Sequence, residues 1–312
     1  METFFVPLAL IVGGLLAVQA AANMQLSKAA GSPLTASTVQ IAVATTVLLA
    51  VTLLGGRLPS LGLLPDVSWW HWLGGLGTAI YITSTILLFP RLGAVVSVGL
   101  FIAGQMLASL ALDAFGLLGV PAKSVGGGDA LGALAVAAGT ALIVGAQTRT
   151  SPVMGTKPSA AGQLGWIVLG LTAGAALPIQ GAINAQLRAD LHLPFAAATI
   201  SFAVAAVAMV LILLPAIILR QAPRLELQRF ATVPWWGWLG GLCGAAYVTA
   251  VFMAIPVIGA AAVVGLTVVG QQLASVFFDR YGFMRLPARP VTMPRLGGVG
   301  FLLAGVAPIQ VT

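Results

Sequence analysis

The chain has very few charged residues. Asp, Glu, Lys and Arg make up only 7% of its 312 residues, whereas 59% are hydrophobic and the mean hydropathy is +1.06. Soluble domains carry about a quarter charged residues, so a soluble fold of this size would lack the side chains that cover a surface. The composition therefore predicts a membrane protein in contact with lipid. Its net charge of +7 then belongs to loops beside the membrane, and we expect no nucleic-acid partner.

Motifs for catalysis and metal binding are also missing. The sequence has no HExxH pair, no GxSxG elbow, no phosphate-binding loop and no cysteine cluster. The single cysteine, Cys243, lies in an apolar run and has no partner for an intrachain disulfide. His71 and His192 are far apart in sequence and are interpreted as residues at the membrane boundary. We therefore expect neither an enzyme nor a cofactor or metal site.

What the sequence does contain is an internal repeat. Gln19-x-x-x-Asn23-x-Gln25-Leu26 returns as Gln180-x-x-x-Asn184-x-Gln186-Leu187, and WWHWLGG at 69–75 returns as WWGWLGG at 235–241. The same register then continues through Tyr81 and Tyr247, Pro90 and Pro256, Gln105 and Gln271, Asp113 and Asp279, and Pro121 and Pro287. This shared order predicts two copies of one unit, residues 1–148 and 162–312, joined by a polar linker at 149–161.

Apolar runs of membrane-spanning length occur five times in each copy. A helix needs about 20 apolar residues to cross the hydrocarbon layer, and unpaired backbone cannot face lipid. The runs predict an all-α, polytopic membrane protein with ten spans, near 4–26, 34–55, 69–89, 93–114 and 129–147, then 162–187, 195–219, 235–255, 259–279 and 296–310. Turn residues such as Gly31-Ser32-Pro33 and Pro90-Arg91 separate them.

An odd number of spans in each copy has a consequence for orientation. If each copy crosses the membrane five times, the second enters from the opposite face, and the two form an inverted repeat. The loops after spans 1, 3, 5, 7 and 9 carry eleven of the 14 Lys and Arg residues. Because positive loops stay in the cytoplasm, both termini are predicted to lie outside the cytoplasm.

Neutral polar side chains recur inside the predicted spans. Side-chain amides and hydroxyls lose their hydrogen bonds in lipid, so they should face other helices or a wet cavity. Either role, contacts between helices or the lining of a cavity, fits a single residue of this kind. As pairs related by inversion they favour a central cavity between the copies, where inverted repeats commonly bind substrate. The residues concerned are Gln19, Asn23, Tyr81, Gln105, Gln180, Asn184, Tyr247 and Gln271.

Two carboxylates, Asp113 and Asp279, end the fourth and ninth predicted spans at opposite faces. Such a pair could form gates or couple transport to an ion, and the alternative is that each ends its helix at the interface. No acidic residue lies deep in a span. A cavity of amides, hydroxyls and aromatic rings suits neutral, zwitterionic or modestly polar organic solutes.

The two units, each with a Q-x-x-x-N-x-Q-L segment and a later WWxWLGG … Y … P-x-x-G … GQ … D-x-x-G series, resemble the YdcZ family of bacterial inner-membrane exporters in the drug/metabolite transporter superfamily. The resemblance covers nearly the whole chain. It implies a ten-helix inverted repeat and alternating access. The acidic residue that small multidrug members of the superfamily carry in their first helix has no equivalent here.

Together these features predict a secondary transporter in the bacterial inner membrane. Its partners would be a small-molecule solute and membrane lipid, and a homodimer is compatible with the sequence. The alternatives are a channel, or a membrane partner protein that transports nothing. The sequence leaves the substrate, the direction of movement and the coupling ion open.

Overall fold

The computed structural model describes residues 2–55, 65–124, 126–148, 160–223 and 227–285, with a few residues between 293 and 305. All elements assigned within these ranges are helical. The α-helices are α1 (Glu2–Ala30), α2 (Pro33–Leu54), α3 (Gly74–Phe115), α4 (Gly127–Thr148), α5 (Ala160–Leu191), α6 (Pro194–Ile218), α7 (Leu227–Phe230), α8 (Leu239–Ile258) and α9 (Ala260–Tyr281), and the 3₁₀ helices are η2 (Trp69–Leu73), η3 (Leu117–Gly119), η4 (Trp235–Trp238) and η5 (Phe283–Arg285).

Seven helical segments within the described residues are long and apolar enough to cross a membrane. They are Phe4–Ala30, Pro33–Leu54, Ser97–Phe115, Leu164–Leu191, Pro194–Ile218, Trp235–Ile258 and Ala260–Phe278. These segments coincide with seven of the ten predicted spans and confirm an all-α membrane fold. Most of the last predicted span, 296–310, lies outside the described residues, so the count of ten stays a prediction.

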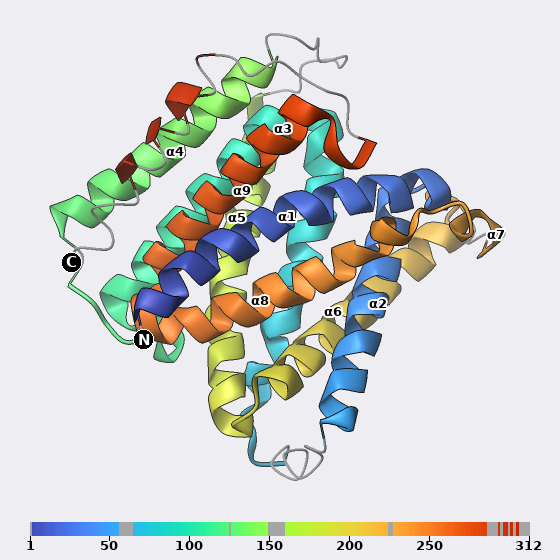
Figure 1. Ribbon diagram of the computed structural model, residues 1–312, viewed down its shortest axis with the longest axis horizontal. Helices are drawn as coiled ribbons and strands as arrows, with labels where there is room; N and C mark the ends of the chain where they lie inside the picture. Colours follow the sequence, from blue (N-terminus) through green and yellow to red (C-terminus); the bar gives the residue numbers. More distant parts are fainter. Residues whose placement is uncertain are drawn as a thin grey trace.

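The third and fourth predicted spans were expected to be two helices, but they form one helix, α3. The sequence predicted a break at Pro90-Arg91, but α3 continues through it from Gly74 to Phe115. Figure 1 shows that α3 bends near its middle, so that two arms diverge from the bend. A proline removes one backbone hydrogen bond and bends a helix without having to end it. In the second half the equivalent break is real, because Gly259 separates α8 from α9 with a φ of 87°.

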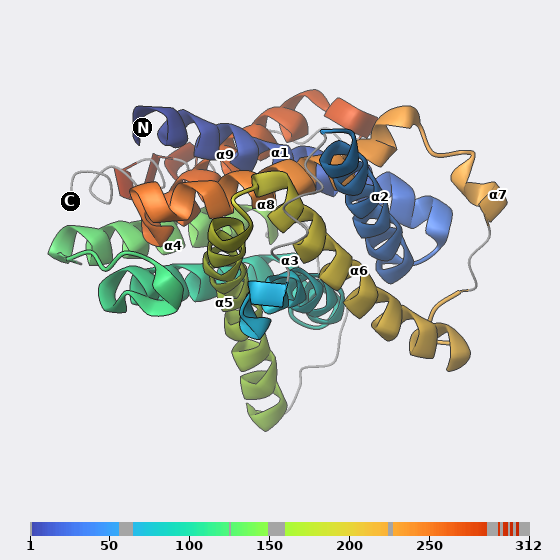
Figure 2. The ribbon, with the colours of Figure 1, turned by 90° about the horizontal axis from the view of Figure 1, so that it is seen from below.

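The two halves exchange their first helices. Helix α1 packs mainly against α8 and α9 of the second half, and α5 packs mainly against α3 of the first half. Figures 1 and 2 both show α1 alongside α8 and α9. Between these groups, α2 packs against α6, its own equivalent in the repeat.

Glycines let the exchanged helices cross closely, and they do so at equivalent positions. A Cβ atom at Gly13 would lie 2.2 Å from the Thr267 carbonyl oxygen, and one at the equivalent Gly174 would lie 2.1 Å from that of Phe101. The partner glycines repeat the pattern, with Gly270 against the Leu10 carbonyl oxygen and Gly104 against that of Leu171. Small residues at crossings are typical of membrane helices, since packing there replaces the hydrophobic effect.

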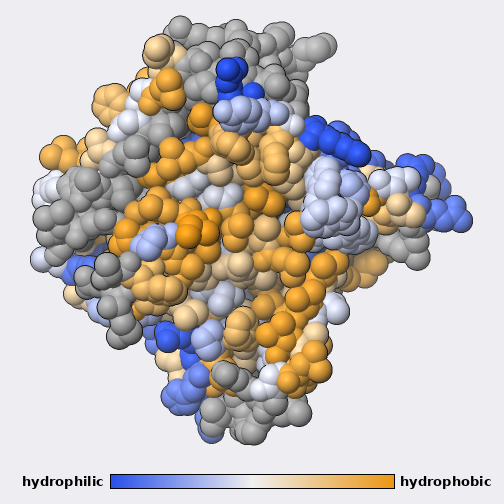
Figure 3. All heavy atoms as spheres, in the orientation of Figure 1, coloured by the Kyte–Doolittle hydropathy of each residue, from blue (hydrophilic) through white to orange (hydrophobic). Residues whose placement is uncertain are grey.

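Residues predicted to share a membrane face lie together. The Arg91 guanidinium is 4.4 Å from the centre of the Trp166 ring, and both residues are predicted to lie at the cytoplasmic face. Lys123 and Ile258, predicted at the outer face, are joined by a 3.0 Å hydrogen bond. Figure 3 shows apolar atoms over much of the visible surface, with hydrophilic atoms mainly at its edges. This distribution suits helices that face lipid. Which face is cytoplasmic stays a prediction.

Candidate functional site: amide and glycine contacts between the halves

The predicted amides of the second half are buried and hydrogen-bonded. Gln180 on α5 is 3% exposed, and its Oε1 accepts a 2.8 Å hydrogen bond from Thr78 Oγ1 on α3. Asn184, one turn further along α5, is fully buried, and its Nδ2 donates a 3.0 Å hydrogen bond to Ser201 Oγ on α6. Sequence reasoning had not singled out Thr78 or Ser201.

Glycines of the first half make room for these amides. A Cβ at Gly74 would lie 2.1 Å from Asn184 Oδ1, and one at Gly77 would lie 2.8 Å from Gln180 Oε1. Gly74 belongs to the repeated WWxWLGG motif, so this motif and the Q-x-x-x-N motif form the two sides of one contact.

The equivalent contact of the first half also packs amides against glycines, but without these hydrogen bonds. Gln19 on α1 lies against Gly244 of α8, where a Cβ would be 2.8 Å from Gln19 Nε2. Gln40 on α2 lies against Gly240, where a Cβ would be 1.6 Å from Gln40 Nε2. Among the described residues, Gln40 Nε2 and Asn23 Oδ1 are buried without hydrogen-bond partners.

Gln40 is a buried residue of this contact that the sequence analysis missed. It is 2% exposed and stands where the second half has Ser201, at the spacing that relates Gln19 to Gln180. The two residue types differ, so matching identical residues between copies could not find this position. A buried glutamine within an apolar helix was the available signal.

The two predicted tyrosines lie at equivalent positions of α3 and α8. The Tyr81 ring lies 5.0 Å from that of Phe101, and Tyr247 is buried on α8. The residue equivalent to Phe101 is Thr267, whose Oγ1 donates a 3.0 Å hydrogen bond to the Val264 carbonyl oxygen.

The predicted glutamines of the fourth and ninth spans follow the crossing glycines directly. Gln105 is buried next to Gly104, and Gln271 is half-buried next to Gly270. Within the described part of the chain, neither side chain has a hydrogen-bond partner.

Asp113 connects the halves at the end of α3. It is 4% exposed, and its two carboxylate oxygens accept 2.7 Å hydrogen bonds from the backbone N–H groups of Ala260 and Ala261, at the start of α9. Lys123 Nζ donates to the Ile258 carbonyl oxygen at the end of α8. The carboxylate thus lies at the N-terminal end of α9 and the ammonium at the C-terminal end of α8. These are the ends at which the helix dipole favours a negative and a positive charge. The side chain of Asp279 lies outside the described part of the structure.

A contact between a histidine and an aspartate near the predicted outer face was not foreseen. His71 Nδ1 contacts Asp190 Oδ2, joining η2 to the end of α5, and His71 is 7% exposed. The two residues are 119 positions apart, and their equivalents are Gly237 and Ala29. The second contact between the halves therefore has no such pair.

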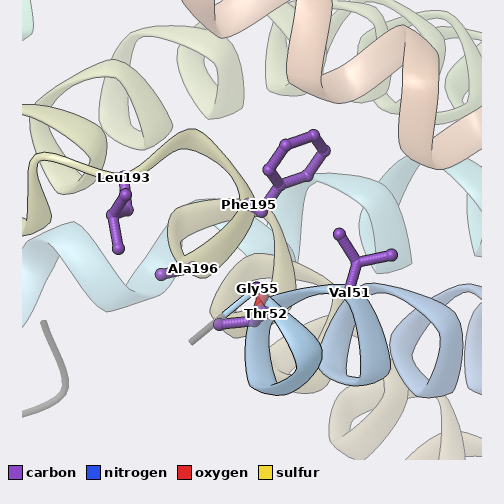
Figure 4. A pocket seen from close by; sticks show the side chains of 6 residues that line it. All are labelled: Val51, Thr52, Gly55, Leu193, Phe195 and Ala196. Atoms are coloured by element: carbon purple, nitrogen blue, oxygen red, sulfur yellow. The ribbon is translucent and has the colours of Figure 1, made fainter. Parts of the chain in front are cut away.

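A cavity of about 170 Å³ lies elsewhere, between the end of α2 and the start of α6. It is lined by Val51, Thr52, Gly55, Leu193, Phe195 and Ala196 (Figure 4). Its polar group, the Thr52 hydroxyl, lies 3.0 Å from that of Thr199. None of the predicted site residues lines this cavity. Among the described residues, no group of His, Cys, Asp or Glu could hold a metal ion.

Comparisons with known proteins identify the family. Residues 4–142 and 165–307 each match the family described as "Putative inner membrane exporter, YdcZ". The chain belongs to this family. Membership confirms a multi-pass inner-membrane protein of the exporter class, built from two related regions.

Among solved structures, 11 chains match this one. One, described only as the crystal structure of a protein, is similar over 99% of this chain and 97% of its own, with a TM-score of 0.67 and 16% sequence identity. At that identity the likeness shows the fold alone. No curated protein matches.

Proposed function

We propose that this YdcZ-family chain exports a small neutral, zwitterionic or modestly polar organic solute by alternating access between its two halves. The observation that carries the proposal is the reciprocal packing, in which the first helix of each half contacts the third and fourth spans of the other. Two equivalent contacts can alternate, because loosening one while tightening the other exchanges similar interactions.

The polar residues at these contacts indicate the class of solute. Gln19, Asn23, Gln180 and Asn184 lie along the two contacts, while Gln105, Gln271, Tyr81 and Tyr247 lie on the helices that the contacts join. None of the eight carries a charge near neutral pH. An ion held there would lack a countercharge, whereas carbonyl, hydroxyl or amide groups could be hydrogen-bonded.

Asp113 and Asp279 are proposed as gate residues at opposite ends of the route. Asp113 can hold the outer end closed through its hydrogen bonds to Ala260 and Ala261, because these bonds join the two halves. Asp279 is its equivalent in the repeat.

Transport by reconstituted protein tests the proposal. A thermal-shift screen over metabolites first identifies a solute, since a ligand stabilises the state that binds it. Uptake of that solute into proteoliposomes is then compared for wild type, Gln105→Ala and Gln271→Ala. Gln221→Ala, which removes an exposed glutamine, is the matched control.

We expect both site variants to fold and to transport at least ~10-fold more slowly, with the control unchanged; this is the effect of losing about 1.4 kcal/mol of solute binding. Uptake that is unchanged in both site variants would remove these glutamines from the route. Wild-type protein that transports no solute in the screen would contradict the proposed function itself.

A further inference from the structure

The two contacts between the halves are equivalent in position but unequal in hydrogen bonding. Where α5 meets α3 and α6, Gln180 pairs with Thr78 and Asn184 pairs with Ser201. Six buried side-chain atoms lack hydrogen-bond partners among the described residues, and four of them belong to α1 and α2. These four are Asn23 Oδ1, Gln25 Nε2, Thr35 Oγ1 and Gln40 Nε2, whereas the second-half contact has one such atom, Asn184 Oδ1, and the sixth is Thr249 Oγ1 on α8.

Three glutamines of the first-half contact follow one line along the second half. The Cβ of Gln25 lies 3.7 Å from the position that a Cβ at Gly237 would take. Gln40 lies against Gly240, and Gln19 lies against Gly244. Three glutamines of the first half thus contact three glycines of η4 and α8 in succession.

The difference in hydrogen bonding between the two contacts follows from the sequence. Thr78, which bonds Gln180, is replaced at the equivalent position by Gly244, so Gln19 finds no hydroxyl. Ser201, which bonds Asn184, is replaced by Gln40. Because these differences lie in the sequence, no rearrangement of the chain can remove them. The first-half contact therefore has fewer hydrogen bonds between side chains than the second-half contact.

Buried polar atoms without partners raise the free energy of the state that buries them. A conformation in which α8 moves away from α1 and α2 would release this cost. Separation would expose Asn23, Gln25 and Gln40 together, because the opposing positions of η4 and α8 are glycines without side chains.

We propose that the contact of α1 and α2 with η4 and α8 is the part that opens to the solute, and that Asn23, Gln25 and Gln40 bind the solute's polar group there. The equivalent contact of α5 and α6 with η2 and α3 closes the other side. This inference rests on the proposed transport function and names the part of the site that recognises the solute.

The chemistry of the three side chains defines the ligand class. Each amide offers both a donor and an acceptor, so the group recognised is itself both, such as a primary amide or a hydroxyl. Lys28 is exposed and lies almost one turn beyond Gln25, and the described part of this contact contains no carboxylate. An organic cation would therefore have no countercharge there.

Cys243 provides a reporter for opening. It lies between Gly240 and Gly244 on α8, and its equivalent, Gly77, contacts Gln180 of the exchanged helix. Cys243 is buried and is the only cysteine of the chain. The rate at which N-ethylmaleimide alkylates Cys243 in proteoliposomes, relative to detergent-denatured protein, thus measures how often the contact opens.

Two substitutions at Gln40 separate hydrogen bonding from packing. Gln40→Ser installs the residue that the second half has as Ser201, so Asn23 gains a hydroxyl to bond. Gln40→Ala leaves a similar space without a hydroxyl. We expect the alkylation of Cys243 to be about fivefold slower in Gln40→Ser than in Gln40→Ala. One net hydrogen bond, about 1 kcal/mol, shifts the equilibrium between closed and open contact by that factor.

Equal rates in the two variants, or no alkylation of Cys243 in folded wild-type protein, would overturn the opening of this contact. Solute binding is measured by thermal shift with a panel of primary amides, polyols, zwitterionic amino acids, organic cations and organic anions. We expect stabilisation by amides, polyols or zwitterions that is lost in Gln40→Ala and weakened less in Ser201→Ala.

The outcomes distinguish the inference from the function on which it rests. If a solute is transported but Gln40→Ala binds it as wild type does, the assignment of these amides is wrong and the transport function stands. If no solute is transported or stabilises the protein, the proposed function is wrong. The alkylation rates decide in either case whether the contact opens.

Discussion

Removing the Asp113 carboxylate should destabilise the junction of α8 and α9 in the other half of the molecule. The carboxylate accepts two 2.7 Å hydrogen bonds from Ala260 and Ala261 and is almost fully buried. Gly259, just before these residues, has a φ of 87°, so the chain reverses direction at this point. Asp113→Ala leaves both N–H groups without an acceptor, whereas Asp113→Asn still offers one carbonyl oxygen.

The expected loss follows from these contacts. Removing an N-cap costs about 0.5–2 kcal/mol, and a hydrogen bond to a charged group contributes about 1.5–3 kcal/mol. With two such bonds in a buried position, Asp113→Ala should lower the free energy of unfolding by about 2–4 kcal/mol. Asp113→Asn should lower it by roughly half of that amount, since one of the two acceptors remains.

The assay is reversible unfolding in mixed micelles by added SDS, followed through the fluorescence of the seven tryptophans. Asp66→Ala is the matched control, because Asp66 is exposed and lies on the segment that leads into η2. The reasoning would be refuted if Asp113→Ala unfolded within about 0.5 kcal/mol of that control, the range of ordinary surface substitutions. A double-mutant cycle with Lys123→Met should show coupling, since Lys123 holds the adjacent end of α8.

Three further outcomes are expected. Gly270→Val should greatly reduce the yield of folded protein, because a Cβ there would lie 1.9 Å from the Leu10 carbonyl oxygen. Gly99→Val is the control and should not reduce it, since no neighbouring atom lies within 4 Å of a Cβ at that position. Size-exclusion chromatography measures the yield of folded protein for the two variants. His71→Ala and Asp190→Ala should each lower the free energy of unfolding by about 1 kcal/mol, and the double variant no further, because the pair is partly exposed. Cysteines placed at Thr3 and Thr312 in a Cys243→Ala background should both react with a membrane-impermeant maleimide from outside; reaction of only one from that side would contradict an even number of spans.

The repeat made much of the fold predictable. The equal spacing of the two copies located the paired helices and the paired polar residues from the sequence alone. The first helix of each half extends well beyond its predicted span, α1 to Ala30 and α5 to Leu191. Hydropathy marks only the part of a helix inside the hydrocarbon, whereas backbone hydrogen bonds continue past it.

The exchange of first helices could not be predicted in the same way. A repeat shows which residues are equivalent, but not whether Gln180 lies against Gly77 of the other copy or Cys243 of its own. The His71–Asp190 pair was hidden for a related reason, because neither residue has a counterpart that repeats it. Sequence symmetry identifies what the halves share, and the polar contacts that differ between them require the structure.

The two most specific motifs of the sequence recur together because each is completed by the other copy. A Cβ at Gly75 would lie 2.0 Å from the Ser201 carbonyl oxygen, and one at Gly241 would lie 2.6 Å from that of Gln40. An isolated five-helix unit would therefore expose both its glycine face and its amides, with nothing to pack against either. The unit needs a second copy, and that copy must supply both motifs. The same reciprocity gives the molecule two equivalent contacts between its halves, each built from one copy of both motifs.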